Sequence, residues 1–167
     1  MNFLSVSEKF HQLVYFLIEH QITIATMESC TGGLLASLLT DSQGASAVFY
    51  GSFISYTNDA KILCGIKPDI IRQYGVYSKE TAIAMAENCC NHYHTNIGIG
   101  VTGTFANPDP NNQDSIAGIV YFVIVFQEKA YDFRIELPQL ENRFSYKLTV
   151  CNFICDALDN ILKEALI

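Results

Sequence analysis

The sequence is short of positive charge. Its 167 residues include 10 Lys and Arg against 17 Asp and Glu, which gives a formal net charge of -7. A protein that binds nucleic acid through phosphate contacts needs a broad basic surface, so direct nucleic-acid binding is not expected. A local pocket with a few cations remains compatible with this composition.

Long apolar runs are also missing. No segment approaches the roughly 18 consecutive apolar residues that a membrane-spanning helix needs, and the N-terminus lacks a basic segment that leads into an apolar stretch. Half of the residues are hydrophobic and 16% are charged, a balance typical of a compact globular protein. We expect a cytoplasmic protein without a membrane partner, folded as one domain over residues 1–167.

The six cysteines follow neither a disulfide nor a zinc pattern. Cys89 and Cys90 are adjacent, and no Cys-x-x-Cys spacing occurs. His92 and His94 follow this pair, but structural zinc normally takes four ligands from two separate segments. We therefore expect reduced cysteines that pack as small hydrophobic residues, and no bound metal.

Hydrophobic periodicity and turn residues predict alternating helices and strands. Ser5 with Glu8 matches a capping box, and Asn58 and Ser78 are expected to cap later helices. The predicted strands cover residues 22–26, 47–56, 97–101, 117–126 and 131–137. The predicted helices begin near residues 5, 34, 58, 68, 78 and 142. Early alternation favours a parallel sheet covered on both faces, and the late strand pair adds one antiparallel member. The fold class is α/β, a three-layer α/β/α sandwich with a mixed, mostly parallel sheet.

The sharpest local signal is the segment Glu28-Ser29-Cys30-Thr31-Gly32-Gly33, between a predicted strand and a helix. A serine at the carboxyl end of a strand faces the crevice where open α/β sheets bind ligands. The helix start offers backbone N–H groups near Gly32 and Gly33 for a phosphate or an oxyanion. Helix capping by Ser29 or Thr31 is the structural alternative.

Lys61 is a candidate base for Ser29. The segment is neither a P-loop nor the Gly-x-Ser-x-Gly elbow of α/β-hydrolases, and the four histidines fall on helix bodies or ends. A lysine in the first turn of a helix and partly buried in a crevice has a lowered pKa, which suits a proton acceptor. Tyr56, at the end of the preceding strand, can orient or relay the proton. A solvated surface lysine is the alternative.

Arg143 is expected at the start of the last helix. A cation there is unfavourable for the helix dipole unless it meets an anion, such as a phosphate. An ordinary exposed arginine is the alternative interpretation.

Taken together, these segments resemble the C-terminal domain of the CinA family, whose stand-alone members are nicotinamide-nucleotide amidases. The resemblance rests on residues 28–36, Gly44-Ala45-Ser46-Ala47-Val48-Phe49, Ser55-Tyr56-Thr57-Asn58-Asp59-Ala60-Lys61, Tyr74-Gly75-Val76-Tyr77-Ser78, Ala84-Met85-Ala86 and Val101-Thr102-Gly103.

The resemblance implies hydrolysis of nicotinamide mononucleotide to nicotinic acid mononucleotide and ammonia, without a cofactor. It implies Ser29 as the nucleophile, Lys61 as its base and Tyr56 as an assisting residue. The residues that it implies for substrate binding are Thr31, Gly32, Gly33, Thr102, Gly103 and, on the phosphate side, Arg143. Backbone N–H groups near Gly32, Gly33 or Gly103 are expected to hold the oxyanion.

The segment 104–118 departs from the family. A glycine-rich stretch is replaced by residues 104–110, where bulky Phe105 and Asn107 stand in place of small residues. A Lys-Pro-Val-Gly motif is replaced by residues 115–118, which removes a cation. We expect the loop over residues 102–115 to be functional or mobile because of its length, and its altered part to approach a ligand less freely than the family's loop.

Three alternative functions stay open. In the first, the changed loop has cost the reaction and the crevice only binds a nucleotide. In the second, the enzyme acts on another small amide. In the third, the protein is an interaction module in competence or damage response. The acidic net charge argues against direct contact with DNA. A homodimer is compatible with the sequence, because two-fold dimers are the commonest soluble assemblies.

Overall fold

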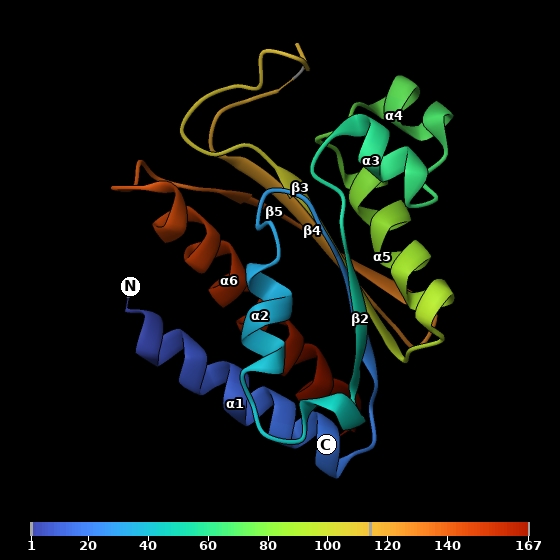
Figure 1. Ribbon diagram of the computed structural model, residues 1–167, viewed down its shortest axis with the longest axis vertical. Coiled ribbons are helices and arrows are strands. Elements are labelled where there is room, and N and C mark those ends of the chain that lie inside the picture. Colours follow the sequence, from blue (N-terminus) through green and yellow to red (C-terminus); the bar gives the residue numbers. More distant parts are fainter. Residues whose placement is uncertain (1, 114, 167) are drawn as a thin grey trace.

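The computed structural model describes residues 2–113 and 115–166, and its strands form one mixed sheet in the order β2-β1-β3-β4-β5 (Figure 1). The strands are β1 (Ile24–Glu28), β2 (Phe49–Ile54), β3 (Ile97–Gly103), β4 (Ile119–Phe126) and β5 (Lys129–Glu136). β1 is parallel to both β2 and β3, and β4 is antiparallel to both β3 and β5. Only β4 therefore opposes the common strand direction, so the predicted mixed, mostly parallel sheet is confirmed.

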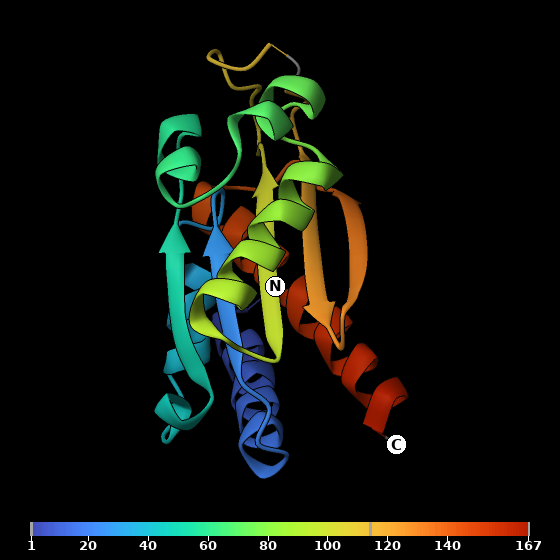
Figure 2. The same ribbon diagram turned by 90° about the vertical axis from the view of Figure 1, so that its right-hand side faces the viewer.

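Helices cover both faces of the sheet. One face carries α1 (Phe3–Glu19), α2 (Leu34–Thr40) and α6 (Arg143–Leu166), and the other carries α3 (Asn58–Leu63), α4 (Pro68–Tyr74) and α5 (Lys79–Tyr93). Figure 2 shows α5 lying across the sheet, with α3 and α4 near the ends to which the β1–β3 arrows point. The predicted three-layer architecture is confirmed.

The largest core lies between the sheet and the α1/α6 layer. Val6, Phe10, Val14 and Leu17 recur at helical spacing on α1 and are almost fully buried, as an amphipathic helix requires. Burying each large apolar side chain contributes about 1.5–3 kcal/mol. The α1/α6 layer packs against β1 and so fixes the position of the carboxyl end of this strand.

The opposite face is packed unusually closely, because β3 contains two glycines under α5. A Cβ atom on Gly98 would lie 2.2 Å from the carbonyl oxygen of Ala86, and one on Gly100 would lie 2.2 Å from that of Ala82. Any side chain at these positions would push α5 away from the sheet. The glycines thus set the distance between these two layers.

Several predicted element ends are wrong by a few residues. Asn2 caps α1 with its side chain, 3.1 Å from the Leu4 amide, so Ser5 lies inside the helix rather than capping it. Thr57, and not Asn58, caps α3. β1 begins and ends two residues later than predicted, and β3 continues to Gly103. Hydrophobic runs locate an element better than they locate its ends.

All six cysteines are free. The Cys89 thiol is fully buried and contacts the carbonyl oxygens of Ala86 and Ile99. Within residues 2–113 and 115–166, no three His, Cys, Asp or Glu side chains converge as a metal site. None of the helices in these ranges combines the length and the hydropathy needed to cross a bilayer.

Candidate active site

A cavity of about 520 Å³ opens at the carboxyl ends of β1, β2 and β3. The three strands are parallel, so the residues that follow them meet at one edge: Ser29 after β1, Tyr56 after β2 and Gly103 at the end of β3. β1 lies between the other two strands. The chain leaves β1 toward α2 on one face of the sheet and leaves β2 toward α3 on the other face, and a crevice forms where this happens. The loop that follows β3 extends above this edge (Figure 1).

Ser29 lines this cavity, and Lys61 lies behind it as its buried hydrogen-bonding partner. Lys61 Nζ lies 2.9 Å from Ser29 Oγ, although the residues are 32 positions apart in sequence. Ser29 is 3% exposed and its amide donates to the carbonyl oxygen of Val101 on β3. The nucleophile candidate is therefore held by the neighbouring strand and by the lysine.

Lys61 is 0% exposed, which makes the solvated-lysine alternative wrong. Burial lowers the pKa of its ammonium group from 10.5 to about 8, because a charged group loses hydration in the interior. The expected contribution of a helix N-terminus is wrong, since Lys61 lies in the last turn of the short helix α3. Desolvation is the cause that remains.

The carbonyl oxygen of Ser55 is a second partner of Lys61 that the sequence did not indicate. It lies 2.8 Å from Lys61 Nζ. Ser55 follows β2 and is itself fixed, because its amide donates to the carbonyl oxygen of Glu28 over 2.8 Å. The two strand ends thus hold both oxygen atoms that contact the lysine nitrogen.

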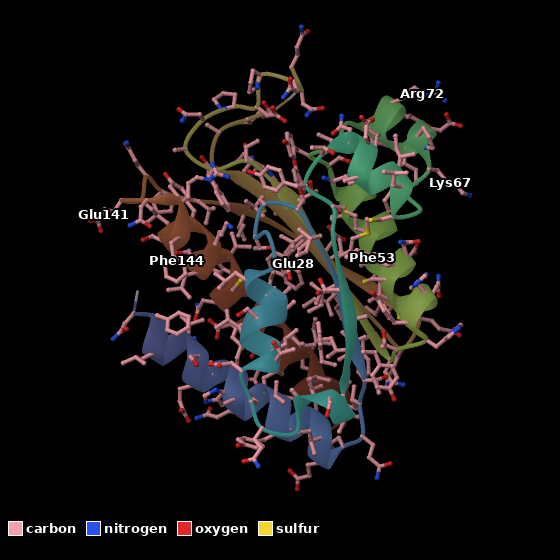
Figure 3. The ribbon with its side chains drawn as sticks, viewed as in Figure 1. Glu28, Phe53, Lys67, Arg72, Glu141 and Phe144 are labelled. Carbon is pink, nitrogen blue, oxygen red and sulfur yellow. The ribbon has the colours of Figure 1, made fainter. Side chains whose placement is uncertain are left out.

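The N-terminus of α2 is closed by the Glu28 side chain, which comes from the end of β1 and is 0% exposed. Its carboxylate accepts hydrogen bonds from the amides of Gly33, Leu35 and Ala36 at 2.8–3.2 Å. In Figure 3 the Glu28 label lies at the end of α2 that faces the loop. The expectation that Ser29 or Thr31 caps this helix is therefore wrong, because a carboxylate already satisfies these donors.

The two glycines of the motif are turn residues rather than cavity residues. Gly32 and Gly33 have φ angles of +56° and +94°, in the left-handed region that favours glycine. The Gly32 amide donates to the carbonyl oxygen of Ser29, and the Gly33 amide to Glu28. Neither residue lines the cavity. The expectation that their amides bind a phosphate or an oxyanion is wrong, because both donors are occupied.

Thr31 and Thr102, also expected to bind substrate, are fully buried and do not line the cavity. Thr102 Oγ1 donates to the carbonyl oxygen of Val76 at 3.0 Å, which ties β3 to the segment before α5. Thr31 Oγ1 has no partner among the described residues. Of the expected binding residues, only Gly103 and Arg143 border the cavity.

Tyr56 contacts Arg143 rather than the Ser29–Lys61 pair. Arg143 Nη2 donates to the Tyr56 hydroxyl at 3.0 Å, across the mouth of the cavity. The guanidinium carbon lies 5.2 Å from the centre of the Phe105 ring. Arg143 stays exposed to solvent, so it presents a positive charge at the rim that no described carboxylate neutralises within 4.0 Å.

Phe105 packs into the core, although it also contributes to the lining of the cavity. The side chain is 2% exposed and stacks on Tyr146 of α6, with 5.1 Å between ring centres and 18° between planes. It anchors the start of the loop in the core and supports Arg143 from beneath. The loop is therefore attached through an apolar contact that small residues could not make.

Truncating this anchor is expected to destabilise the protein. Phe105→Ala should lower the free energy of unfolding by about 3 kcal/mol, since it removes a buried ring and leaves a cavity. Urea unfolding measures the loss. Phe153→Ala, at a ring that is 43% exposed on α6, is the matched control and should cost well under 1 kcal/mol, roughly as surface substitutions do. Equal losses for both variants would show that Phe105 is not an anchor.

The rest of the loop is held by a polar cluster that the sequence did not reveal. Asp109 accepts hydrogen bonds from the Tyr77 hydroxyl and from Asn112 Nδ2, both at 2.6 Å. Asn58 Nδ2 donates to Asn112 Oδ1 at 2.8 Å. These contacts join the loop to α3 and to the segment before α5, although residue 114 lies outside the described residues. Residues 107–112, which are all Asn, Pro or Asp, are typical of a loop, but they do not indicate which residues the loop contacts.

Cys30 is the other nucleophilic side chain at the cavity, and it is next to Ser29. Burial raises the pKa of its thiol to about 12. A thiol is a weak nucleophile until it loses its proton. Cys30 is therefore inert near neutral pH, and Ser29 is the nucleophile candidate.

These features define a class: a three-layer α/β protein with a buried Ser–Lys pair where three parallel strands end. Comparison with known proteins then identifies the family. The sequence profile of the CinA C-terminal domain matches residues 7–162, so the chain belongs to the CinA C-terminal domain family.

Relatives and solved structures agree with this assignment. A protein of Acetivibrio thermocellus, whose name calls it competence-damage inducible, is 41% identical over 137 residues, which are 81% of this chain and 33% of that protein. A CinA-like protein of Leptospira borgpetersenii is 42% identical over 121 residues, covering 72% and 29%. The chain thus spans about a third of the length of these curated relatives.

The crystal structure of the competence/damage inducible protein CihA from Agrobacterium tumefaciens has a TM-score of 0.84 and 26% identity. The alignment covers 93% of this chain and 94% of that one. A competence damage-inducible protein A from Klebsiella pneumoniae has a TM-score of 0.86 at 21% identity, over 95% and 97% of the two chains. The second likeness shows the shared fold alone.

Proposed function

We propose that this protein is an amidohydrolase that converts nicotinamide mononucleotide and water to nicotinic acid mononucleotide and ammonia. The observation that carries the proposal is the 2.9 Å hydrogen bond between buried Lys61 Nζ and the Oγ of Ser29, which lines the cavity. Serine alone is a weak nucleophile, and a neighbouring base of lowered pKa activates it. The resemblance of the motifs to nicotinamide-nucleotide amidases suggests the substrate.

Neutral Lys61 begins the reaction by accepting the proton of Ser29. One of its N–H bonds points to the carbonyl oxygen of Ser55, which leaves the nitrogen lone pair available to the Ser29 hydroxyl. Ser29 Oγ then forms a bond to the carboxamide carbon. The C–N bond breaks, and ammonia leaves with the proton from Lys61. Water attacks the resulting ester in the same way and regenerates Ser29.

The oxyanion requires donors other than those of Gly32 and Gly33. The amide of Cys30 follows Ser29 directly, Cys30 lines the cavity, and no oxygen acceptor for this amide occurs among the described residues. We assign the oxyanion to this amide. Backbone donors aimed at developing charge are worth about 10²–10³ in rate each.

Arg143 supplies the positive charge for the phosphate. It stands at the rim of the cavity, braced by the Tyr56 hydroxyl and by the Phe105 ring. An arginine fork suits the two or more oxygens of a phosphate monoester. In this arrangement Tyr56 acts through Arg143, as a positioning residue for the substrate.

The pH dependence of the reaction follows from the pKa of Lys61. Only the neutral amine can accept a proton, and burial lowers the pKa to about 8. We expect kcat/KM for nicotinamide mononucleotide to rise about tenfold per pH unit below pH 8 and to level off above it. Initial rates of ammonia release between pH 6 and pH 10 measure the profile. A rate that is flat across this range would exclude Lys61 as the base.

The first test is ammonia release from nicotinamide mononucleotide by the purified protein. Release with stoichiometric formation of nicotinic acid mononucleotide supports the proposal. Calorimetric binding of the nucleotide by a folded protein that releases no ammonia would instead identify a nucleotide-binding module. Release from another small amide, and none from the nucleotide, would change the substrate and keep the reaction type.

A further inference from the structure

The loop places a negative charge inside the cavity. Asp109 lines the cavity together with Ser29, and its charge reaches Lys61, where it opposes part of the shift that burial causes in the lysine pKa. Asp59 and Arg143 are the other charged residues of the lining. The cavity therefore offers both signs of charge to one ligand.

Asp109 is fixed and stays ionised. Its carboxylate accepts from the Tyr77 hydroxyl, from Asn112 Nδ2 and from the Asn111 amide. The hydrogen bond from Tyr77 lowers the pKa of Asp109. All three donors are uncharged groups, and no cation of the described residues lies within 4.0 Å of the carboxylate. Its charge is thus oriented but not neutralised.

An aromatic ring accompanies this charge. Tyr77 lines the same cavity, and its hydroxyl is the group that holds Asp109 at 2.6 Å. Aromatic faces attract cations, and a neighbouring carboxylate adds to that attraction. A planar cation is the ligand that both groups favour, whereas an anion or a neutral amide gains little from the carboxylate.

We propose that Asp109, together with the ring of Tyr77, makes the cavity selective for carboxamides carried on a cationic aromatic ring. The charge distribution then fits a zwitterion, with its anionic group at Arg143 and its cationic ring at Asp109. This inference rests on the proposed function, because it names the part of the substrate that the loop recognises.

The experiment compares two nucleotides that differ in ring charge. Nicotinamide mononucleotide has a cationic ring, and its reduced dihydro form has the same phosphate, ribose and carboxamide with a neutral ring. Dissociation constants are measured by calorimetry on the Ser29→Ala protein, which prevents turnover. We expect the cationic nucleotide to bind on the order of tenfold more tightly, and the ratio to fall to near one when Asp109→Asn is added.

Two controls separate charge from loop structure. Tyr77→Phe keeps the charge and the ring but loses the hydrogen bond to Asp109, so most of the preference should persist. Asp69→Asn, on the surface of α4 beside Arg72, removes the same charge away from the cavity and should leave the ratio unchanged. Melting temperatures show that each variant is folded.

The outcomes for the inference and for the proposed function are distinct. Equal affinity for the two nucleotides in the Ser29→Ala protein, or a preference that persists in folded Asp109→Asn, would overturn the inference while ammonia release still tests the function. A charge preference in a protein that releases no ammonia would uphold the recognition and overturn the hydrolase.

Discussion

Ser29→Ala is expected to reduce ammonia release from nicotinamide mononucleotide by at least about 10³-fold. The substitution removes the only atom that can form the ester, while Cys30 beside it stays protonated because burial raises its pKa to about 12. The fold should persist, since Ser29 is held by its backbone amide through Val101. Initial rates and near-UV circular dichroism on the same samples measure both effects.

Ser52→Ala is the matched control. Ser52 lies on β2, where its hydroxyl bonds to Thr26 at 2.8 Å, and it does not line the cavity. It loses a comparable side-chain hydrogen bond without touching Lys61, so its rate should stay within a few-fold of the wild type. Turnover by Ser29→Ala at more than a tenth of the wild-type rate would remove Ser29 as nucleophile.

The fold was largely predictable from hydrophobic patterns. Apolar residues at helical spacing on α1 indicate a helix with one buried face, whereas the short segments of β1 and β3 are buried at every position. Alternation of such helices and strands leads to a parallel sheet covered on both faces. The ends were less predictable because caps compete locally. Asn2, Ser5 and Thr57 all have the right chemistry, and only the final packing selects among them.

The candidate site was predictable where a motif follows a strand. Parallel strands end at one edge, which is why Ser29, Tyr56 and Gly103 meet there. The sequence did not indicate which backbone N–H groups already have a hydrogen-bond acceptor within the protein. Nothing in the sequence indicates that Glu28 turns back to occupy the amides of α2, and this single contact excludes Gly33 as an anion site.

The sequence patterns also did not predict the long-range contacts of the loop after β3. Asp109 and Tyr77 are 32 positions apart, and their contact depends on where β3 and α5 place the two segments. The same applies to Phe105, because its stacking on Tyr146, 41 positions later in the chain, depends on where β3 and α6 place the two rings. A bulky residue in a loop can serve as an anchor to the core as well as a barrier.

Lys61→Met is expected to lower the rate of ammonia release by at least about 10³-fold and to change how the free energy of unfolding depends on pH. The folded protein keeps the pKa of Lys61 near 8, whereas the unfolded chain has the ordinary value of 10.5. As the pH rises from 8 to 10.5, the folded state has released this proton and the unfolded state still holds it. The free energy of unfolding of the wild type therefore rises in this window.

Methionine has no such proton, so the wild type gains stability relative to Lys61→Met as the pH increases. Between pH 7 and pH 9 the gain is about 1 kcal/mol, from the linkage between the two pKa values. Urea unfolding of both proteins at each pH measures it, and shared titrations cancel in the difference. Lys67→Met, at an exposed lysine before α4, should show no such trend.

A difference between wild type and Lys61→Met that stays constant with pH would mean that burial does not perturb this lysine. The base would then be charged at neutral pH and unable to activate Ser29. A difference that rises with pH would connect the effects of Lys61 on stability and on activity. Desolvation makes its charged form costly to bury, and the same desolvation makes Lys61 a base near neutral pH. The site gives up stability at pH 7, and in return about a tenth of Lys61 is neutral there, whereas an ordinary lysine is almost entirely charged.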